Sequence, residues 1–312
     1  MHIKTPKFWN KKHSLVSYLL LPFSWIYYTI SRIRPFITKP TKVSVPVVCI
    51  GNITAGGSGK TPVAIAIAKL LQSQNKTVHF LTRGYGGNIK TPTLVNPDMH
   101  TAQNVGDEPL LLTRTAPTWV ARDRIAGANE AIAKGADIIV MDDGLQNPTL
   151  YKDVKILVVD GKYGLGNGRL IPAGALREKP TDCNADVAVC VGDFSDKLKE
   201  QLNMEIISAT IIPDSIIPQK VVAFAGIGHP EKFFNTLESV GVNIIERIEF
   251  PDHYPYTKAD IEKLQTVASK HNARLITTEK DFVRLPDTRN ILTLPITAQL
   301  DEQKLLALFK HL

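Results

Sequence analysis

A glycine-rich segment carries the clearest chemical signal in the sequence. It reads Thr54-Ala55-Gly56-Gly57-Ser58-Gly59-Lys60-Thr61, with Thr54 where the strict pattern has glycine. The apolar run Val47–Ile50 precedes it and a helical pattern follows, which is the context that a phosphate-binding loop requires. Its backbone N–H groups and the helix N-terminus would face phosphate oxygens, with Lys60 at the β- and γ-phosphates and the Thr61 hydroxyl on Mg²⁺. The alternative is a glycine-rich turn with a surface lysine.

Two adjacent carboxylates, Asp142 and Asp143, follow another apolar run, Ile138–Met141. Neighbouring carboxylates at a strand terminus are costly to ionise together unless a cation compensates them. We therefore expect them on the metal side of the phosphate loop, although an acidic turn after a strand is common in isolation. The Asn-Lys-x-Asp pattern that selects guanine is absent from the sequence, which favours ATP.

Phosphoryl transfer also needs a base for the acceptor and cations for the developing charge. The chain offers carboxylates at a predicted helix start, arginines in predicted loops and a histidine in a proline-bounded loop: Asp107 and Glu108, Arg122, Arg124 and Arg177, and Asp252 with His253. Taken one by one, each has a simpler interpretation as a helix cap, a surface arginine or an ordinary loop residue.

The elements that must position these residues follow from an alternation of apolar runs and helical patterns. Strands are predicted at Val47–Ile50, Thr77–Leu81, Thr118–Val120, Asp137–Met141, Val154–Asp160 and Ala185–Val191, and helices at Thr61–Gln74, Asp107–Thr113 and Asp123–Lys134. Strands that are apolar throughout and alternate with helices predict an α/β fold, a P-loop NTPase-like parallel sheet with helices on both faces.

A second series predicts a smaller α/β lobe. Its strands are Val221–Ala225, Asn243–Phe250 and Arg274–Thr278, and its helices are Pro230–Val240 and Lys258–His271. We expect Glu205–Ile212 and Asn290–Thr297 to form an extended pair that ties the lobes together, and Asp301–Leu312 to be a helix. The expected division is an N-terminal segment 1–36, a P-loop domain 37–206, the smaller lobe with its linker strands 207–298, and a C-terminal helix 299–312.

The N-terminal segment has its own composition. Residues 1–42 hold no acidic residue and these basic ones: Lys4, Lys7, Lys11, Lys12, Arg32, Arg34, Lys39 and Lys42. The uncharged stretch from Ser14 to Ile30 is short for a spanning helix, and no signal-peptide cleavage site follows it. We expect a membrane-associated helix lying at the membrane surface, held by apolar burial and anionic lipid. A buried helix with a solvated basic lead and a single span are the alternatives.

Composition narrows the function classes. The chain has 312 residues and a net charge of +7, and because the excess lies at the N-terminus the body is close to neutral. This charge distribution argues against a partner that is a nucleic acid. Cys49, Cys183 and Cys190 show no metal spacing, so we expect buried thiols and no disulfide.

A series of short motifs runs through nearly the whole chain in a specific order. They are Gly51-Asn-Ile-Thr-Ala-Gly-Gly-Ser-Gly-Lys-Thr-Pro62, Arg83-Gly-Tyr-Gly-Gly87, Val105-Gly-Asp-Glu-Pro109, Asp142-Asp-Gly-Leu-Gln146, Pro172-Ala-Gly-Ala-Leu-Arg-Glu178, Ala225-Gly-Ile-Gly-His-Pro230, Phe250-Pro-Asp-His253 and Thr278-Glu-Lys-Asp-Phe282. Together they resemble the tetraacyldisaccharide 4'-kinase family of lipid A biosynthesis, whose loop also begins as this one does at Thr54.

The resemblance implies transfer of the γ-phosphate of ATP, with Mg²⁺, to the 4'-hydroxyl of a membrane-embedded acylated disaccharide lipid at the cytoplasmic face of the inner membrane. It implies these roles: Lys60 and Thr61 at the phosphates and Mg²⁺; Asp142 and Asp143 as metal-side carboxylates, helped by Glu108 and Gln146; Asp107 as the base, oriented by His253; and Arg177 with Arg122 or Arg124 at the γ-phosphate. Two other functions stay open, a membrane-bound switch ATPase and a small-molecule synthetase. Transfer of labelled phosphate to lipid rather than to water separates the kinase from the ATPase.

Overall fold

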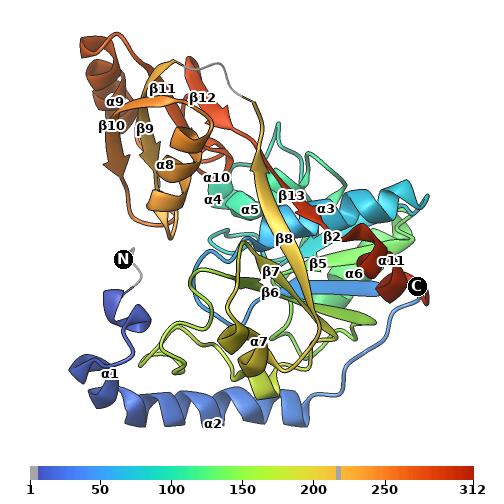
Figure 1. Cartoon of the computed structure of the whole chain (residues 1–312). Coiled ribbons are helices and arrows are strands. Elements are labelled where there is room, and N and C mark those ends of the chain that lie inside the picture. The colour runs from blue at the N-terminus through green and yellow to red at the C-terminus, as the bar shows by residue number, and fades with distance from the viewer. Residues whose placement is uncertain (1–5, 216–218) are drawn as a thin grey trace.

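Two β-sheets organise the chain in the computed structural model, which describes residues 6–215 and 219–312 and leaves Lys4 of the basic segment outside. We call the larger sheet with its helices the large lobe, and the smaller sheet with its helices the small lobe. Helices α1 (Leu15–Leu19) and α2 (Leu21–Ile37) lie along the base of the large lobe, on the side away from the small lobe (Figure 1).

The large sheet has the strand order β13-β8-β7-β6-β1-β5-β2-β4-β3. The strands are β1 (Val47–Gly51), β2 (Val78–Thr82), β3 (Thr93–Leu94), β4 (Thr118–Val120), β5 (Ile138–Asp142), β6 (Val154–Asp160), β7 (Val187–Val191), β8 (Ile206–Pro213) and β13 (Ile296–Leu300). Neighbours pair in parallel except at the two edges, where β3 and β13 run antiparallel. Strand β1 lies between β5 and β6, so the loop that follows it leaves the sheet centre at the carboxyl edge, where α/β proteins bind ligands.

Helices cover both faces of the large sheet, as predicted. Val48 and Ile50 of β1 enter the core beneath α3 (Lys60–Ser73) and α11 (Glu302–Phe309). Val47 and Cys49 point the other way, into the core beneath α6 (Arg124–Ala133), and α7 (Asp196–Leu202) extends that layer. Because successive strand residues face opposite cores, the central strands are apolar throughout. All three cysteines are buried and unpaired, as predicted.

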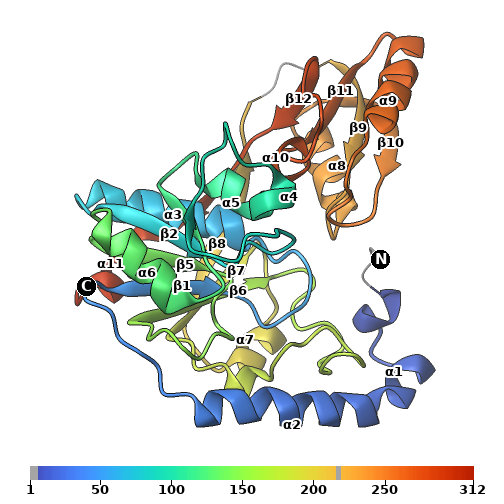
Figure 2. The same ribbon diagram turned by 180° about the vertical axis from the view of Figure 1, so that it is seen from behind.

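The small sheet is wholly parallel, with the order β10-β9-β11-β12. Its strands are β9 (Lys220–Ala225), β10 (Asn243–Glu249), β11 (Arg274–Thr278) and β12 (Ile291–Leu294). Helix α8 (Pro230–Ser239) packs on one face and α9 (Lys258–Lys270) on the other, while the single turn α10 (Glu279–Phe282) follows β11 (Figure 2).

The predicted extended pair between the lobes is shifted. Strand β8 pairs antiparallel with β13, from Pro213 opposite Ile296 to Ala209 opposite Leu300, at the edge of the large sheet. The residues just before β13 form β12 of the small sheet instead. Pro295 separates the two strands, because proline cannot donate a ladder hydrogen bond and its carbonyl instead accepts from Asp214 N. One predicted segment is therefore two strands in different sheets.

The N-terminal helices are half exposed rather than buried. Within the described residues no helix is both long and apolar enough to cross a membrane. Small polar residues face the large lobe, with Ser17 and Ser24 buried. The outward face carries large apolar side chains, each more than half exposed: Leu15, Leu19, Phe23, Trp25, Ile26, Ile30, Ile33, Phe36 and Ile37. We call these residues the apolar face.

Candidate active site

The glycine-rich segment connects β1 to α3 at the centre of the large sheet. Gly59, just before the helix, has a left-handed backbone with φ of +84°, a conformation that glycine adopts without strain. Asn52 supports the loop from inside, because its buried side-chain amide donates to Ser58 Oγ at 3.1 Å. The Lys60 side chain is only 10% exposed, so the alternative of a surface lysine is wrong.

The two predicted metal-side carboxylates differ in their surroundings. Asp143 forms ion pairs with Lys60 at 3.7 Å and with Arg177 at 3.1 Å, and these cations lower its pKa although burial opposes them. Both carboxylate oxygens of Asp142 are buried and have no hydrogen-bond partner among the described residues. Burial, followed by the charge of Glu108, raises the pKa of Asp142 to about 8.

Orphaned carboxylate oxygens beside a glycine-rich loop fit a divalent cation. The described residues hold no cluster of three or more His, Cys, Asp or Glu side chains that could bind a metal alone. Mg²⁺ does not need one, since it commonly binds through one or two carboxylates together with substrate phosphates and water. The donor set around Asp142 therefore fits Mg²⁺ brought in with a nucleotide.

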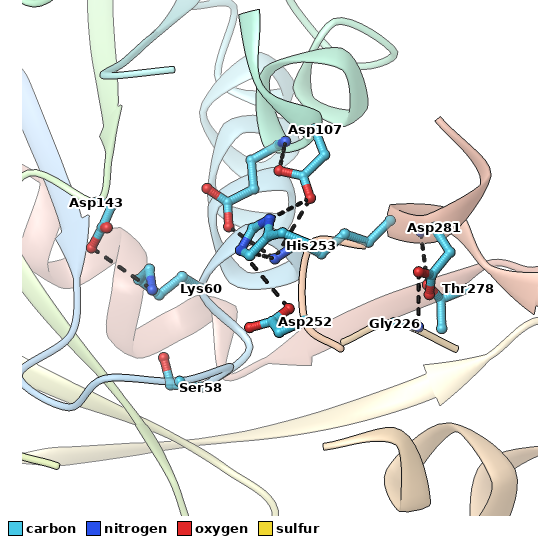
Figure 3. Close-up of polar contacts among 12 residues, drawn as sticks. Ser58, Lys60, Asp107, Asp143, Gly226, Asp252, His253, Thr278 and Asp281 are labelled. Carbon is cyan, nitrogen blue, oxygen red and sulfur yellow. Dashed lines mark hydrogen bonds and ion pairs between the residues drawn. The ribbon is translucent and has the colours of Figure 1, made fainter. Parts of the chain in front are cut away.

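A hydrogen bond joins the lobes at Asp107 and His253 (Figure 3). Asp107 opens α5 (Asp107–Leu112) of the large lobe, and its buried Oδ2 lies 3.0 Å from His253 Nδ1 of the small lobe. His253 has φ of +57°, a left-handed backbone that strains a non-glycine residue, and its N–H donates to Gly226 O. On its other side His253 Nε2 lies 3.8 Å from Asp252 Oδ1. Residues far apart in the sequence thus meet between the lobes.

Two cations that sequence reasoning did not assign surround this pair. Lys280 Nζ lies 3.8 Å from Asp107 Oδ2, 3.4 Å from Glu108 Oε1 and 3.4 Å from His253 Nε2. Arg284 Nε lies 3.7 Å from Asp107 Oδ2. Burial alone would raise the pKa of Asp107, but Lys280, His253 and Arg284 outweigh it and hold the pKa well below its usual range. Asp107 is therefore a carboxylate at neutral pH.

Lys280 is in turn held as a cation. Burial would lower its pKa, but Glu108, Asp107 and Asp252 outweigh that effect and raise it to about 12. The motif Thr278–Phe282 contained Lys280, but nothing in the motif indicated that its side chain would reach across to α5.

Asp281 fixes the small-lobe side of the site. Its carboxylate is fully buried and accepts from Gly226 N at 2.9 Å, Tyr256 Oη at 2.7 Å and Arg284 Nη2 at 2.6 Å. Thr278 Oγ1 donates to its second oxygen. Because Gly226 also accepts from the His253 N–H, one buried carboxylate holds the segments that carry His253 and Arg284.

The remaining predicted residues are dispersed. Arg124 is buried and donates to Ala121 O, and burial lowers its pKa to about 10, whereas Arg122 is exposed. Arg124 still lies close enough to lower the pKa of Asp143. Gln146 directs its amide nitrogen to Asn52 O at 2.9 Å and Glu178 Oε1 at 2.6 Å. Only one of the two arginines is thus near the carboxylates.

The small lobe also closes over the glycine-rich loop. A Cβ added to Gly228 would lie 3.5 Å from Gly57 N. The His229 ring stacks on Tyr163 of the large lobe with centroids 4.0 Å apart. Thr54, Gly56 and Ser58 line a pocket there together with Tyr163 and His229. The same Gly228 Cβ would lie 3.5 Å from Asp252 Oδ2, and Asp252 is the neighbour of His253, so the Asp107–His253 pair lies beside the glycine-rich loop.

A glycine-rich loop with an inward lysine, orphaned carboxylates and a carboxylate–histidine pair define a nucleotide-dependent α/β kinase. The chain matches the family model described as tetraacyldisaccharide-1-P 4'-kinase over residues 16–312. It belongs to this family, so the sequence-based assignment is confirmed.

Relatives and a solved structure agree. The tetraacyldisaccharide 4'-kinase of Parvibaculum lavamentivorans is 45% identical over 297 residues, which cover 91% of this chain and 87% of the relative. That of Rhodospirillum rubrum is 44% identical over 296 residues, covering 91% and 89%. The crystal structure of LpxK from Aquifex aeolicus in complex with ATP has a TM-score of 0.78 and 28% identity, covering 95% of this chain and 99% of that one.

Proposed function

We propose that the chain transfers the γ-phosphate of ATP to the 4'-hydroxyl of a tetraacyldisaccharide 1-phosphate lipid, as a step in lipid A biosynthesis. The observation that carries this proposal is the Asp107–His253 hydrogen bond, which joins the two lobes beside the phosphate-binding loop. An ATPase acting on water has no need of a base supplied jointly by two lobes, whereas a large acceptor must enter between them.

Asp107 and His253 would act together on the acceptor proton. A sugar hydroxyl is a weak nucleophile, and a group within hydrogen-bond reach takes its proton as the bond to phosphorus forms. The cations around Asp107 keep it ionised and so make it a weak base by itself. We propose that the Asp107–His253 pair shares the proton, with His253 oriented by its bond at 3.0 Å and by Asp252 on its far side.

Lys60, Thr61, Asp142 and Asp143 would hold the phosphates and Mg²⁺, which when bound supplies charge neutralisation at the phosphoryl oxygens. Asp142 has the orphaned oxygens that such an ion requires. Lys60 and Arg177 both pair with Asp143, at 3.7 and 3.1 Å, so both cations already point to the carboxylate side of the proposed phosphate site.

The remaining candidates take secondary places in this proposal. Arg124, rather than the exposed Arg122, is the second arginine that we place near the transferred group. Glu108 and Gln146 would act on the metal side only indirectly, because Glu108 pairs with Lys280 and Gln146 with Glu178.

The N-terminal helices would dock on the cytoplasmic face of the inner membrane, where the protein can reach a lipid acceptor that stays in the bilayer. The apolar face supplies area for burial, and exposed basic side chains near it, Lys11, Lys12 and Arg32, supply attraction to anionic lipid. In this proposal the N-terminal segment meets the membrane, the large lobe holds ATP and the small lobe completes the site.

The test is an assay with γ-³²P-ATP and a panel of acylated disaccharide phosphates in detergent micelles. The proposal expects label in the lipid, dependence on Mg²⁺, and loss of transfer in Lys60→Ala. Label released only as inorganic phosphate, at a rate independent of lipid, would refute it in favour of an ATPase.

A further inference from the structure

One loop lies between the N-terminal helices and the phosphate-binding loop. It comprises residues 167–177, which follow β6 and end at Arg177. We call it the bridging loop. On one side it contacts α1 and α2, and on the other it contacts the segment that follows β1.

Two serine hydroxyls of the N-terminal helices bind the near side of the bridging loop. Ser24 Oγ donates to Leu170 O at 2.8 Å and accepts from Ala173 N at 3.1 Å. Ser17 Oγ donates to Ala173 O and accepts from Arg169 Nη1 at 2.8 Å. Both serines are buried, at 0% and 2% exposure, so these bonds replace water completely. In the sequence these serines were interruptions of an apolar stretch; in the fold they are its contacts with the large lobe.

Tyr27 reaches the far end of the same loop. Its hydroxyl donates to Arg177 O at 3.0 Å. The Arg177 N–H donates in turn to Ile53 O, and Ala55 N donates to Ala175 O, each at 2.7 Å. The Arg177 side chain meets Asp143 at 3.1 Å. A continuous set of hydrogen bonds thus leads from α2 to the phosphate-binding loop.

We infer that Ser17, Ser24 and Tyr27 are positioning residues of the active site, and that the N-terminal helices set the placement of Arg177 and of the phosphate-binding loop. The inference rests on the proposed function, because it assigns Arg177 a task in phosphate transfer. A helix that served only to hold the protein on lipid would need its apolar face but not these inward hydroxyls. Backbone polar groups fixed by buried partners lose their freedom, which is what a phosphate site of defined geometry requires.

The sharpest test compares two neighbouring tyrosines. Tyr27→Phe removes the hydroxyl that binds Arg177 O and keeps the ring. Tyr28→Phe is the matched control, because the Tyr28 hydroxyl has no hydrogen bond within the described residues and its ring contacts Lys179. Both tyrosine rings are half-buried against the large lobe and lie outside the apolar face, so we expect vesicle binding to stay unchanged in both variants. We expect Tyr27→Phe to lower kcat about threefold to tenfold, the rate equivalent of one hydrogen bond, with an unchanged KM for ATP and unchanged vesicle binding. Tyr28→Phe should stay within about twofold of wild type on the same scale.

A second measurement does not need activity. Hydrogen exchange at the amides of Ala55 and Arg177 should speed up in Tyr27→Phe and in Ser24→Ala, and should stay at the wild-type rate in Tyr28→Phe. Equal kcat for the two tyrosine variants, or unchanged exchange at both amides, overturns the inference. A wild-type chain without lipid phosphorylation would refute the proposed function, and the exchange comparison would still decide the positioning role.

Discussion

Replacing His253 by alanine is the most direct test of the shared base. The change removes the Nδ1 partner of Asp107 at 3.0 Å and leaves Lys280 and Arg284 within 3.8 Å of the same carboxylate oxygen. Because those cations still compensate the buried charge, we expect the variant to fold. His253 is also about a quarter exposed, so its loss leaves no closed cavity.

The expected loss of rate in His253→Ala follows from the hydrogen bond that the variant lacks. A hydrogen bond to a charged group contributes about 1.5–3 kcal/mol, which equals about 10- to 150-fold in rate when it is expressed in the transition state. Asp107→Ala should cost more, about 10²- to 10⁴-fold, because it removes the proton acceptor itself. The double variant should lose little beyond Asp107→Ala, since groups that act as a unit are non-additive.

The assay measures kcat with saturating ATP and lipid, together with nucleotide affinity. His271→Ala is the matched control, because His271 lies exposed at the end of α9 in the same lobe. ATP affinity should be unchanged in all variants. Multiplicative losses in the double variant, or a native kcat for His253→Ala, would mean that Asp107 acts alone.

Four further outcomes are expected. Lys60→Ala should abolish transfer while the chain still folds, as a cooperative transition in calorimetry would show, because Arg177 still pairs with Asp143. Asp142→Asn should raise the stability of the metal-free chain by roughly 2–4 kcal/mol at pH 7. The pKa of Asp142 is about 8 in the folded chain, so above pH 4 the folded chain holds a proton that the unfolded chain has lost, and wild type loses stability as the pH rises toward 8. The stability that Asp142→Asn gains over wild type should therefore be smaller at pH 5 than at pH 7, as urea titrations can measure. Ile26→Glu on the apolar face should weaken vesicle binding in sedimentation at unchanged Tm, whereas equal binding would place docking elsewhere. Asp281→Ala should destabilise by about 3–5 kcal/mol, because it breaks the buried ion pair with Arg284 and leaves Gly226 N and Tyr256 Oη without their acceptor.

The sequence predicted those helices and strands whose residues show one clear pattern of hydrophobicity. The central strands β1, β5 and β6 are buried on both faces and so read as continuous apolar runs, and each was placed within about two residues. The short turns α4 (Ala102–Val105) and α10 were missed, since one helical turn has no periodicity to detect. The predicted bounds of the second strand in the β8–β13 pair were wrong, because the bounds of an edge strand depend on its pairing in the folded sheet and not on local composition.

For the candidate site, the sequence indicated residues in dense local motifs, but it gave no role to Lys280 and Arg284, which reach Asp107 from the other lobe. The phosphate-binding loop is contiguous, and its context can be checked in the sequence. Asp107 and His253 were among the candidates that the sequence offered, but their joint role came from the family resemblance, and their contact is now seen in the geometry. Lys280 lies in the motif Thr278–Phe282, but the motif assigned it no role, and no motif contained Arg284. Both matter only because the small lobe folds their segment against α5.

The pairing of β8 with β13 determines where the small lobe could be removed from the chain or exchanged. The chain leaves the large sheet at Pro213 and returns at Ile296, which are direct partners in one antiparallel ladder. The small lobe is therefore spliced into what would otherwise be a β-hairpin, and a short turn could close that gap without rethreading the sheet. We therefore expect the small lobe to be exchangeable between family members as one unit. Chimeras that carry a foreign small lobe would keep their own phosphate-binding loop and acquire the donor's histidine loop as a unit.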